Sequence, residues 1–256
     1  MQDATQAGHI QYQVADGIAT IEFYHPGHNS LPGRLLSELT EALDQAGKDE
    51  LVKVVILRSA GDRTFCAGAS FDELAAIDNP TRGKAFFLGF ANVINAIRRC
   101  PKFVLGRVQG KAIGGGVGLA CAVDYCVATR FSAVKLSELA IGIGPFVVGP
   151  AVARKIGQAA FQQLTINATA LKPAEWAREK GMYAEVFEDA AAMDEHLNEL
   201  AQKLANSNPE AMQNLKEVFW QSAHDWDELL AERAATSGQL VLSDFSRKAI
   251  ARFKGK

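Results

Sequence analysis

A chain of 256 residues with 48 % hydrophobic and 22 % charged side chains is long enough and apolar enough to bury a full-sized core, which excludes a disordered or fibrous protein. The formal net charge is −2, from 27 Lys and Arg against 29 Asp and Glu, and no long basic run occurs. A nucleic-acid-binding protein needs a concentrated positive surface, so this class is not expected.

Cysteine spacing and the N-terminus indicate which metals and which compartment to expect. Cys66, Cys100, Cys121 and Cys126 form no C-x-x-C pair, so we expect neither a zinc site nor a disulfide framework. The N-terminus, MQDATQAGHIQYQV, lacks the basic start and apolar run of a signal peptide. No apolar stretch reaches the roughly 20 residues that a membrane-spanning helix needs. These features favour a soluble, cytoplasmic protein that binds no metal and does not enter the membrane.

The first part of the chain alternates strand and helix patterns. Residues 10–14 and 17–24 have the pattern of two strands around a turn. Residues 34–47 place leucines on one face of an amphipathic helix. Residues 54–58, VVILR, begin with the short apolar run that is typical of a buried strand.

The alternation continues through the middle of the chain, with helices predicted at residues 71–76, 82–99 and 117–122 and strands at 103–108, 125–128 and 134–136. From about Gly149 helical patterns dominate, with amphipathic helices at 190–205, 209–223 and 226–242 and one later strand candidate at Glu185–Phe187. We predict an α/β fold in which residues 1–190 form a core of strand–strand–helix units. Residues 191–256 form a helical C-terminal region that follows without a linker.

Two glycine-bearing loops each follow an apolar strand and lead into a helix: residues 65–70, FCAGAS, and 113–117, IGGGV. A helix N-terminus leaves its first N–H groups unpaired, and glycine lets a ligand approach the backbone closely. Two such loops can direct two amides at one point and form an oxyanion hole. The alternative is that the glycines serve only tight turns and close packing. Neither loop fits a G-x-G-x-x-G or P-loop nucleotide signature.

Three segments carry a resemblance to a known family. TFCAGASFDEL resembles the F-C-A-G-A-D-[LI]-x-E-[LM] segment of the enoyl-CoA hydratase/isomerase (crotonase) superfamily. VQGKAIGGGVGLACAVDYCVAT is similar to its N-G-x-A-x-G-G-G-x-E-L-A-x-x-C-D segment, and HPGHNSL to its P-x-x-x-N-A-L turn. The likeness runs from about Gly17 to the C-terminus, where FSRKAIARF is only loosely similar to the family's closing motif.

The resemblance implies a spiral of ββα units, a homotrimer or a dimer of trimers, and an acyl-CoA thioester as substrate, with no cofactor beyond that coenzyme A. It implies that the backbone amides of Ala69 and Gly115 form the oxyanion hole. By the same resemblance, the CoA-binding positions are Cys66, Ala67, Gly68, Ala69, Gly114, Phe245 and Lys248. The last two would reach the nucleotide of a neighbouring subunit.

The family's hydratases use two glutamates, and this chain retains only one of them. The first position is Gly118, whereas the second is Glu138, within LSELAIGIGPF. Burial would raise the pKa of Glu138 toward neutrality, which suits a group that exchanges protons. A paired or capping carboxylate beside a glycine-rich turn is the alternative for Glu138. Cys66 has no histidine close in sequence, so a nucleophilic thiol is not expected.

The first choice from the sequence is hydration of a 2-enoyl-CoA, or the reverse dehydration, with Glu138 as acid/base. The stretch LSELAIGIGPFVVGPAVARKIG looks closest to methylglutaconyl-CoA hydratase-like members, which suggests a short branched acyl group. The second choice is a Δ3,Δ2-enoyl-CoA isomerase, which one glutamate can serve. Decarboxylation or another thioester reaction comes third. A non-catalytic CoA-binding subunit is the alternative outside enzymes.

Overall fold

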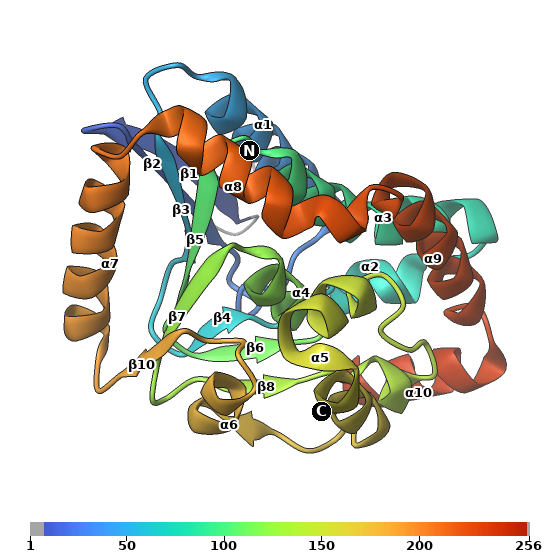
Figure 1. Cartoon of the computed structure of the whole chain (residues 1–256). Helices are drawn as coiled ribbons and strands as arrows, with labels where there is room; N and C mark the ends of the chain where they lie inside the picture. The colour runs from blue at the N-terminus through green and yellow to red at the C-terminus, as the bar shows by residue number, and fades with distance from the viewer. Residues whose placement is uncertain (1–7, 255–256) are drawn as a thin grey trace, which may run out of the picture.

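Two β-sheets organise the computed structural model, which describes residues 8–254 (Figure 1). The larger sheet has the order β1 (His9–Ala15), β2 (Ile18–Tyr24), β3 (Val54–Ser59), β5 (Phe103–Val108), β7 (Tyr125–Thr129) and β10 (Glu185–Phe187). In it β1 pairs antiparallel with β2, and the other pairs are parallel. The smaller sheet has the order β4 (Thr64–Cys66), β6 (Lys111–Ile113), β8 (Ala133–Lys135) and β9 (Lys172–Pro173).

The chain winds through these sheets in repeated strand–strand–helix turns. Each turn contributes one strand to the larger sheet, the next strand to the smaller sheet, and then helix. The turns are β3–β4 with α2 (Phe71–Ala76) and α3 (Pro80–Arg99), β5–β6 with α4 (Gly115–Ala122), and β7–β8 with the 3₁₀ helix η1 (Glu138–Ile141) and α5 (Gly149–Ile166). This is the predicted α/β spiral of ββα units.

Both faces of the larger sheet are covered, and alternate side chains of β3 pack against opposite layers. In β3, Val54 and Ile56 pack against Met193 and Leu197 of α7 (Ala190–Ala205). The intervening Val55 and Leu57 belong to the main core, on the side of α1 (Gly33–Lys48) and α3. A strand that is buried on both faces has a continuous run of apolar residues. The run in residues 54–58 therefore predicted β3 correctly.

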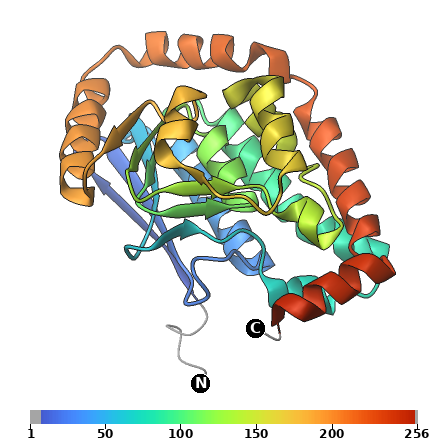
Figure 2. The same cartoon turned by 90° about the horizontal axis from the view of Figure 1, so that it is seen from below.

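The C-terminal helices wrap around the outside of the spiral (Figure 2). They are α6 (Ala174–Glu179), α7, α8 (Pro209–Trp220), the 3₁₀ turn η2 (Gln221–Ala223), α9 (Trp226–Leu240) and α10 (Asp244–Lys254). The α9 helix packs directly on α3, where Gly83 faces Gly238 so closely that a Cβ on Gly83 would lie 2.7 Å from the Gly238 Cα. This glycine–glycine contact brings the residues of α9 close to the interior of the molecule.

The short strands are where sequence and structure differ. Residues 59–70 and 110–113 gave no strand prediction, yet β4 and β6 lie within them, and two-residue β9 was missed entirely. Strands of two or three residues are too short to show a period-2 pattern, so neighbouring strands define them. The proposed division at residue 190 remains a prediction. The first seven residues, part of the N-terminus interpreted as lacking a signal peptide, lie outside the described residues.

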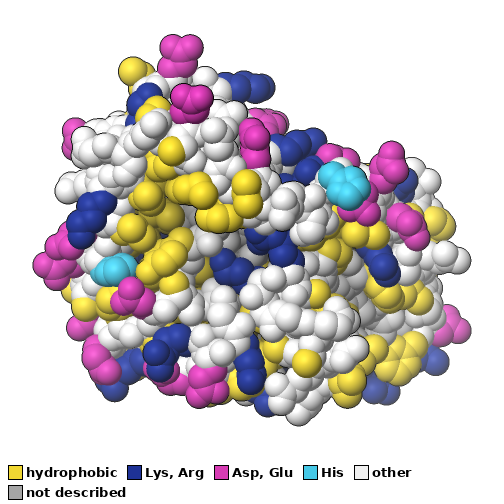
Figure 3. All heavy atoms as spheres, in the orientation of Figure 1, with side chains coloured by type: hydrophobic (Ala, Val, Ile, Leu, Met, Phe, Trp, Pro, Cys, Tyr) yellow, Lys and Arg dark blue, Asp and Glu magenta, His cyan; other side chains and the backbone are white. Residues whose placement is uncertain are grey.

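The distribution of surface charge and the hydropathy of the helices both bear on the expectations from composition. Acidic and basic side chains are interspersed over the face shown in Figure 3. Within residues 8–254, no helix combines the length and the apolar character needed to cross a membrane.

Candidate active site

Three consecutive parallel strands of the smaller sheet bring the candidate residues together. β4 pairs in parallel with β6, and β6 pairs in parallel with β8. Parallel strands end at the same edge of a sheet, and ligands bind preferentially at such edges. Ala69 follows β4, Gly115 follows β6 and Glu138 follows β8, so residues far apart in sequence meet at one edge.

The loops after β4 and β6 are in direct contact. Gly68 has φ 86°, a backbone conformation that favours glycine, and a Cβ on it would lie 2.8 Å from the Ile113 carbonyl oxygen and 3.2 Å from the Gly115 nitrogen. Gly114, with φ 52° and ψ −117°, is the N-cap of α4. Gly68 therefore keeps the two loops in contact, because a side chain there would force them apart, whereas a side chain on Gly114 would meet the Glu138 carboxylate.

The hydrogen bonds among the described residues of the two loops leave the Ala69 and Gly115 amides free to bind a ligand. Leu31 N–H donates to the Gly68 carbonyl oxygen at 2.8 Å. In a trans peptide the C=O and the following N–H point in opposite directions, so the Ala69 N–H faces away from Leu31. The Gly114 carbonyl oxygen likewise accepts from Val117 N–H at 2.9 Å, inside α4. The Gly115 N–H therefore points outward from the helix N-terminus, where the helix dipole favours negative charge.

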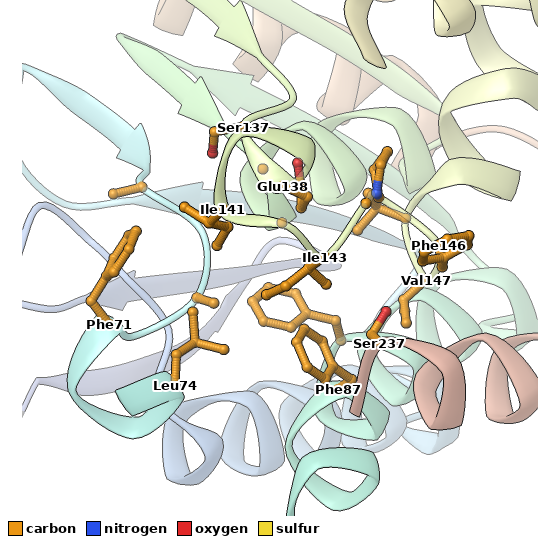
Figure 4. Close-up of a pocket in the computed structure, with 18 residues that line it drawn as sticks. Phe71, Leu74, Phe87, Ser137, Glu138, Ile141, Ile143, Phe146, Val147 and Ser237 are labelled. Atoms are coloured by element: carbon orange, nitrogen blue, oxygen red, sulfur yellow. The ribbon is translucent and has the colours of Figure 1, made fainter. Parts of the chain in front are cut away.

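Both amide-bearing residues line one cavity of about 60 Å³ (Figure 4). A buried water needs roughly 10–15 Å³ of such space, so the cavity can hold a small acyl group. Its walls come from α2, α3, η1, the loop after η1 and α9. The lining residues are Ala67, Ala69, Phe71, Leu74, Phe87, Phe90, Gly114, Gly115, Ser137, Glu138, Ile141, Ile143, Gly144, Pro145, Phe146, Val147, Val148 and Ser237.

Glu138 places its carboxylate inside this cavity, beside Gly114. A Cβ on Gly114 would lie 3.0 Å from the Glu138 Oε1 atom. The residue as a whole is half-buried, but its Oε2 is shielded from solvent and has no hydrogen-bond partner among the described residues. Burial raises the pKa of Glu138 to about 7, against a smaller opposing effect of its own backbone amide. Such a carboxyl group can both accept and return a proton near neutral pH.

A second buried carboxylate, Asp124, shows what a structural acid looks like in this fold. Its Oδ2 lies 2.9 Å from Lys216 Nζ and accepts from Val104 N–H at 2.7 Å, while Oδ1 accepts from Trp220 Nε1–H at 3.0 Å. Asp124 therefore connects α8 to the larger sheet. Glu138 lacks such partners, which argues against the alternative of a paired carboxylate.

Burial of Glu138 should lower the stability of the protein as the pH rises from 4.5 to about 7. Below pH 4.5 both the folded and the unfolded chain hold the proton; between pH 4.5 and about 7 only the unfolded chain releases it, so stability falls. We expect Glu138→Gln to exceed wild type in free energy of unfolding by about 3 kcal/mol at pH 8 and by much less at pH 5. Urea denaturation at the two pH values measures this. An advantage of equal size at both values would contradict the raised pKa.

The family's first glutamate corresponds to Gly118, and there is no space for a side chain at this position. A Cβ on Gly118 would lie 2.6 Å from the Cβ of Val148, which is itself buried. The Val148 side chain therefore occupies the space into which a residue at position 118 would project. Within the part of the chain that the structure describes, Glu138 is the only acidic residue lining the cavity.

The predicted CoA-binding positions divide into two groups. Ala67 lines the cavity, and Gly68 and Gly114 shape it. Cys66 is fully buried, and burial raises the pKa of its thiol to about 12, which opposes a nucleophilic role.

The other two predicted CoA-binding residues lie on α10. Phe245 and Lys248 are exposed. Phe245 contacts the turn after η1, because a Cβ on Gly142 would lie 2.5 Å from its Cδ1. Their contact with the nucleotide of a neighbouring subunit stays a prediction.

Sequence reasoning missed several cavity residues, chiefly Val148, Phe87 and Ser237. Figure 4 shows Phe87 and Ser237 approaching the cavity from α3 and α9, opposite Glu138. Phe87 has the ordinary spacing of a core residue, and Ser237 lies in a helix of mixed polar and apolar residues. No sequence signal distinguishes these positions, because the α3–α9 contact alone brings them to the cavity.

Comparison with known sequences shows which family the chain belongs to. A family model described as Enoyl-CoA hydratase/isomerase matches residues 13–255. The chain belongs to this family. Its members share the crotonase-type fold, so the resemblance carried by the glycine loops and the predicted fold class are both confirmed.

Individual relatives within the enoyl-CoA hydratase/isomerase family match most of the chain. A Bacillus subtilis (strain 168) protein named Probable enoyl-CoA hydratase is 26 % identical over 249 residues, covering 96 % of each chain. The mitochondrial methylglutaconyl-CoA hydratase of Rattus norvegicus is 32 % identical over 194 residues, covering 74 % of this chain and 61 % of the relative. The enoyl-CoA hydratase structure from Bacillus halodurans superimposes with a TM-score of 0.88 at 19 % identity, covering 95 % of this chain and 99 % of that one.

Proposed function

We propose that this enzyme transfers protons to and from the carbon chain of an enoyl-CoA thioester, and that its reaction is the shift of a double bond between the 3- and 2-positions. The observation that carries the proposal is a single carboxylate, Glu138, whose Oε2 has no hydrogen-bond partner among the described residues and which lies in the cavity that Ala69 and Gly115 also line. In this role coenzyme A is part of the substrate, and no further cofactor is needed. Assembly as a homotrimer or a dimer of trimers stays a prediction.

The two amides would stabilise the charge that develops on the thioester. When the ionised Glu138 removes a proton from the α-carbon of a 3-enoyl-CoA, the electron pair moves into a dienolate and negative charge collects on the thioester oxygen. Two N–H donors directed at that oxygen lower the energy of this intermediate, each by about 2.7–4 kcal/mol in comparable sites. The protonated Glu138 then returns the proton to the γ-carbon, and the double bond closes at the 2-position.

The closed position beside Gly118 supports isomerisation over hydration. Hydration must activate a water and also protonate the α-carbon, and the family's hydratases divide these tasks between two glutamates. Here the space for the first glutamate is filled by Val148. Isomerisation requires one base that releases the same proton two carbons away, and apolar walls protect the dienolate from unwanted protonation by water.

Hydration of a 2-enoyl-CoA, the first choice from the sequence, is the second candidate. It is supported by the free Glu138 Oε2, which could hold a water, and by the name of the Bacillus subtilis relative. In this reaction one carboxylate oxygen would activate the water while the other delivers the proton to the α-carbon.

Product masses separate the two candidates. Incubation with but-3-enoyl-CoA should yield crotonyl-CoA of unchanged mass, seen as a gain of 2-enoyl absorbance. Incubation with crotonyl-CoA should show no gain of one water. Efficient water addition would overturn isomerisation in favour of hydration, and absence of both reactions would overturn the proposed function.

A pair of variants tests whether the lack of space beside Gly118 prevents hydration. Gly118→Glu combined with Val148→Gly supplies both the carboxylate and the space, and should gain water addition to crotonyl-CoA. Gly118→Glu alone, the control, should gain none because its side chain collides with Val148. If the control and the double variant hydrated crotonyl-CoA at equal rates, Val148 would not be what prevents hydration.

A further inference from the structure

The wall of the cavity beyond Glu138 and the two amides is apolar. Phe87 and Phe90 line it from α3. Ile143, Phe146 and Val147 come from the loop after η1 (Figure 4). Phe87 and Phe90 are almost fully buried, so these surfaces belong to the core. An acyl chain attached to a thioester at the amides would extend over them.

The polar groups near this wall cannot neutralise an anion. Ser137 and Ser237 line the cavity, and each offers one hydroxyl donor. Among the lining residues, all of which are described, none is Lys, Arg or His. Glu138 lies in the same small cavity, so a second carboxylate would also be repelled by it whenever Glu138 is ionised.

A carboxylate on the acyl chain would therefore lose its hydration without gaining a partner. Burial of an unpaired carboxylate is among the most unfavourable changes in a protein interior, whereas burial of a methyl group is favourable. An acyl group ending in methyl and one ending in carboxylate have nearly the same size, so charge rather than shape separates them.

We propose that this cavity selects uncharged acyl groups and rejects acyl-CoA thioesters whose acyl chain ends in a carboxylate. The inference rests on the proposed function, because it assigns the cavity to the acyl chain. It departs from the substrate that similarity to the methylglutaconyl-CoA hydratases suggests, since a 3-methylglutaconyl group carries a terminal carboxylate. The apolar wall favours a short straight or branched hydrocarbon chain.

A matched pair of non-reacting ligands tests the proposal without turnover. Valeryl-CoA and glutaryl-CoA both have five-carbon acyl groups and differ by a terminal carboxylate. Calorimetric titration of the full chain at pH 8 should give a dissociation constant about 100-fold or more lower for valeryl-CoA. Dissociation constants within threefold of each other would overturn the selection against charge.

Free coenzyme A separates this inference from the proposed function. If valeryl-CoA binds no more tightly than free coenzyme A, the cavity is not an acyl site and the proposed function itself fails. If both thioesters bind equally and more tightly than coenzyme A, the acyl site stands and only the selection against charge is wrong.

Substitutions of Phe146 test whether charge causes the difference in affinity between the two thioesters. Phe146 is half-buried, so a longer side chain can be accommodated there. Phe146→Arg should tighten glutaryl-CoA binding at least tenfold relative to the neutral control Phe146→Met, with the two variants alike toward valeryl-CoA. Equal glutaryl-CoA binding by both variants would overturn the explanation by charge.

Discussion

Replacing Glu138 by Gln is expected to slow the conversion of but-3-enoyl-CoA to crotonyl-CoA by about 100- to 10,000-fold, the usual contribution of a general acid/base. The carboxamide has the same shape but cannot accept the α-proton. Because the two amides and the apolar walls are untouched, binding of valeryl-CoA should change little. Mass spectrometry of reactions run in D₂O measures both the rate and the deuterium incorporated from solvent.

Asp124→Asn is the matched control, because it removes a buried carboxylate that does not line the cavity. Asp124 is paired with Lys216, so its loss leaves a buried cation and should lower the free energy of unfolding by about 3–5 kcal/mol. The folded fraction should retain its isomerase rate. If Glu138→Gln kept most of its activity, or if Asp124→Asn lost as much activity per folded molecule, Glu138 would not be the proton-transfer group.

Gly68→Ala should impair catalysis without touching any reactive side chain. Its Cβ would meet the Ile113 carbonyl oxygen at 2.8 Å and the Gly115 nitrogen at 3.2 Å, which pushes one amide donor away from the other. Displacement of one such donor typically lowers kcat about 100- to 1,000-fold. Steady-state kinetics on but-3-enoyl-CoA should therefore show a loss mainly in kcat.

Gly61→Ala separates this effect from backbone strain. Gly61 has φ 83°, close to the 86° of Gly68, but a Cβ there would have no heavy atom of the described chain within 4 Å. Both variants carry the cost of about 1–2 kcal/mol for an alanine with positive φ. Only Gly68→Ala should lose activity, and comparable losses in kcat would show that strain, not the displaced amide, is responsible.

The sequence predicted best those elements whose pattern is local. The VVILR run defines β3, and the leucines of residues 34–47 define α1, because burial imposes a period on each. β4 and β6 contain three residues each and have no period of their own. They form because β4 pairs with β6 and β6 pairs with β8, and these pairings depend on the tertiary structure.

The candidate site divides in the same way. The glycine loops and Glu138 carry local motifs, so the family resemblance located them before the structure did. That Val148 fills the space beside Gly118 could not be predicted, since these residues lie 30 positions apart and meet only when α5 packs on α4. The cavity walls from α3 and α9 likewise depend on the Gly83–Gly238 contact.

In the proposed mechanism the amides of residues 69 and 115 share one target with the carboxylate of residue 138. A crystal structure of the Glu138→Gln variant with bound but-3-enoyl-CoA tests this most directly. We predict a thioester oxygen about 2.7–3.1 Å from both amide nitrogens, with the side chain of residue 138 against the α-carbon. A thioester oxygen bound elsewhere, or an α-carbon out of reach of that side chain, would contradict the account.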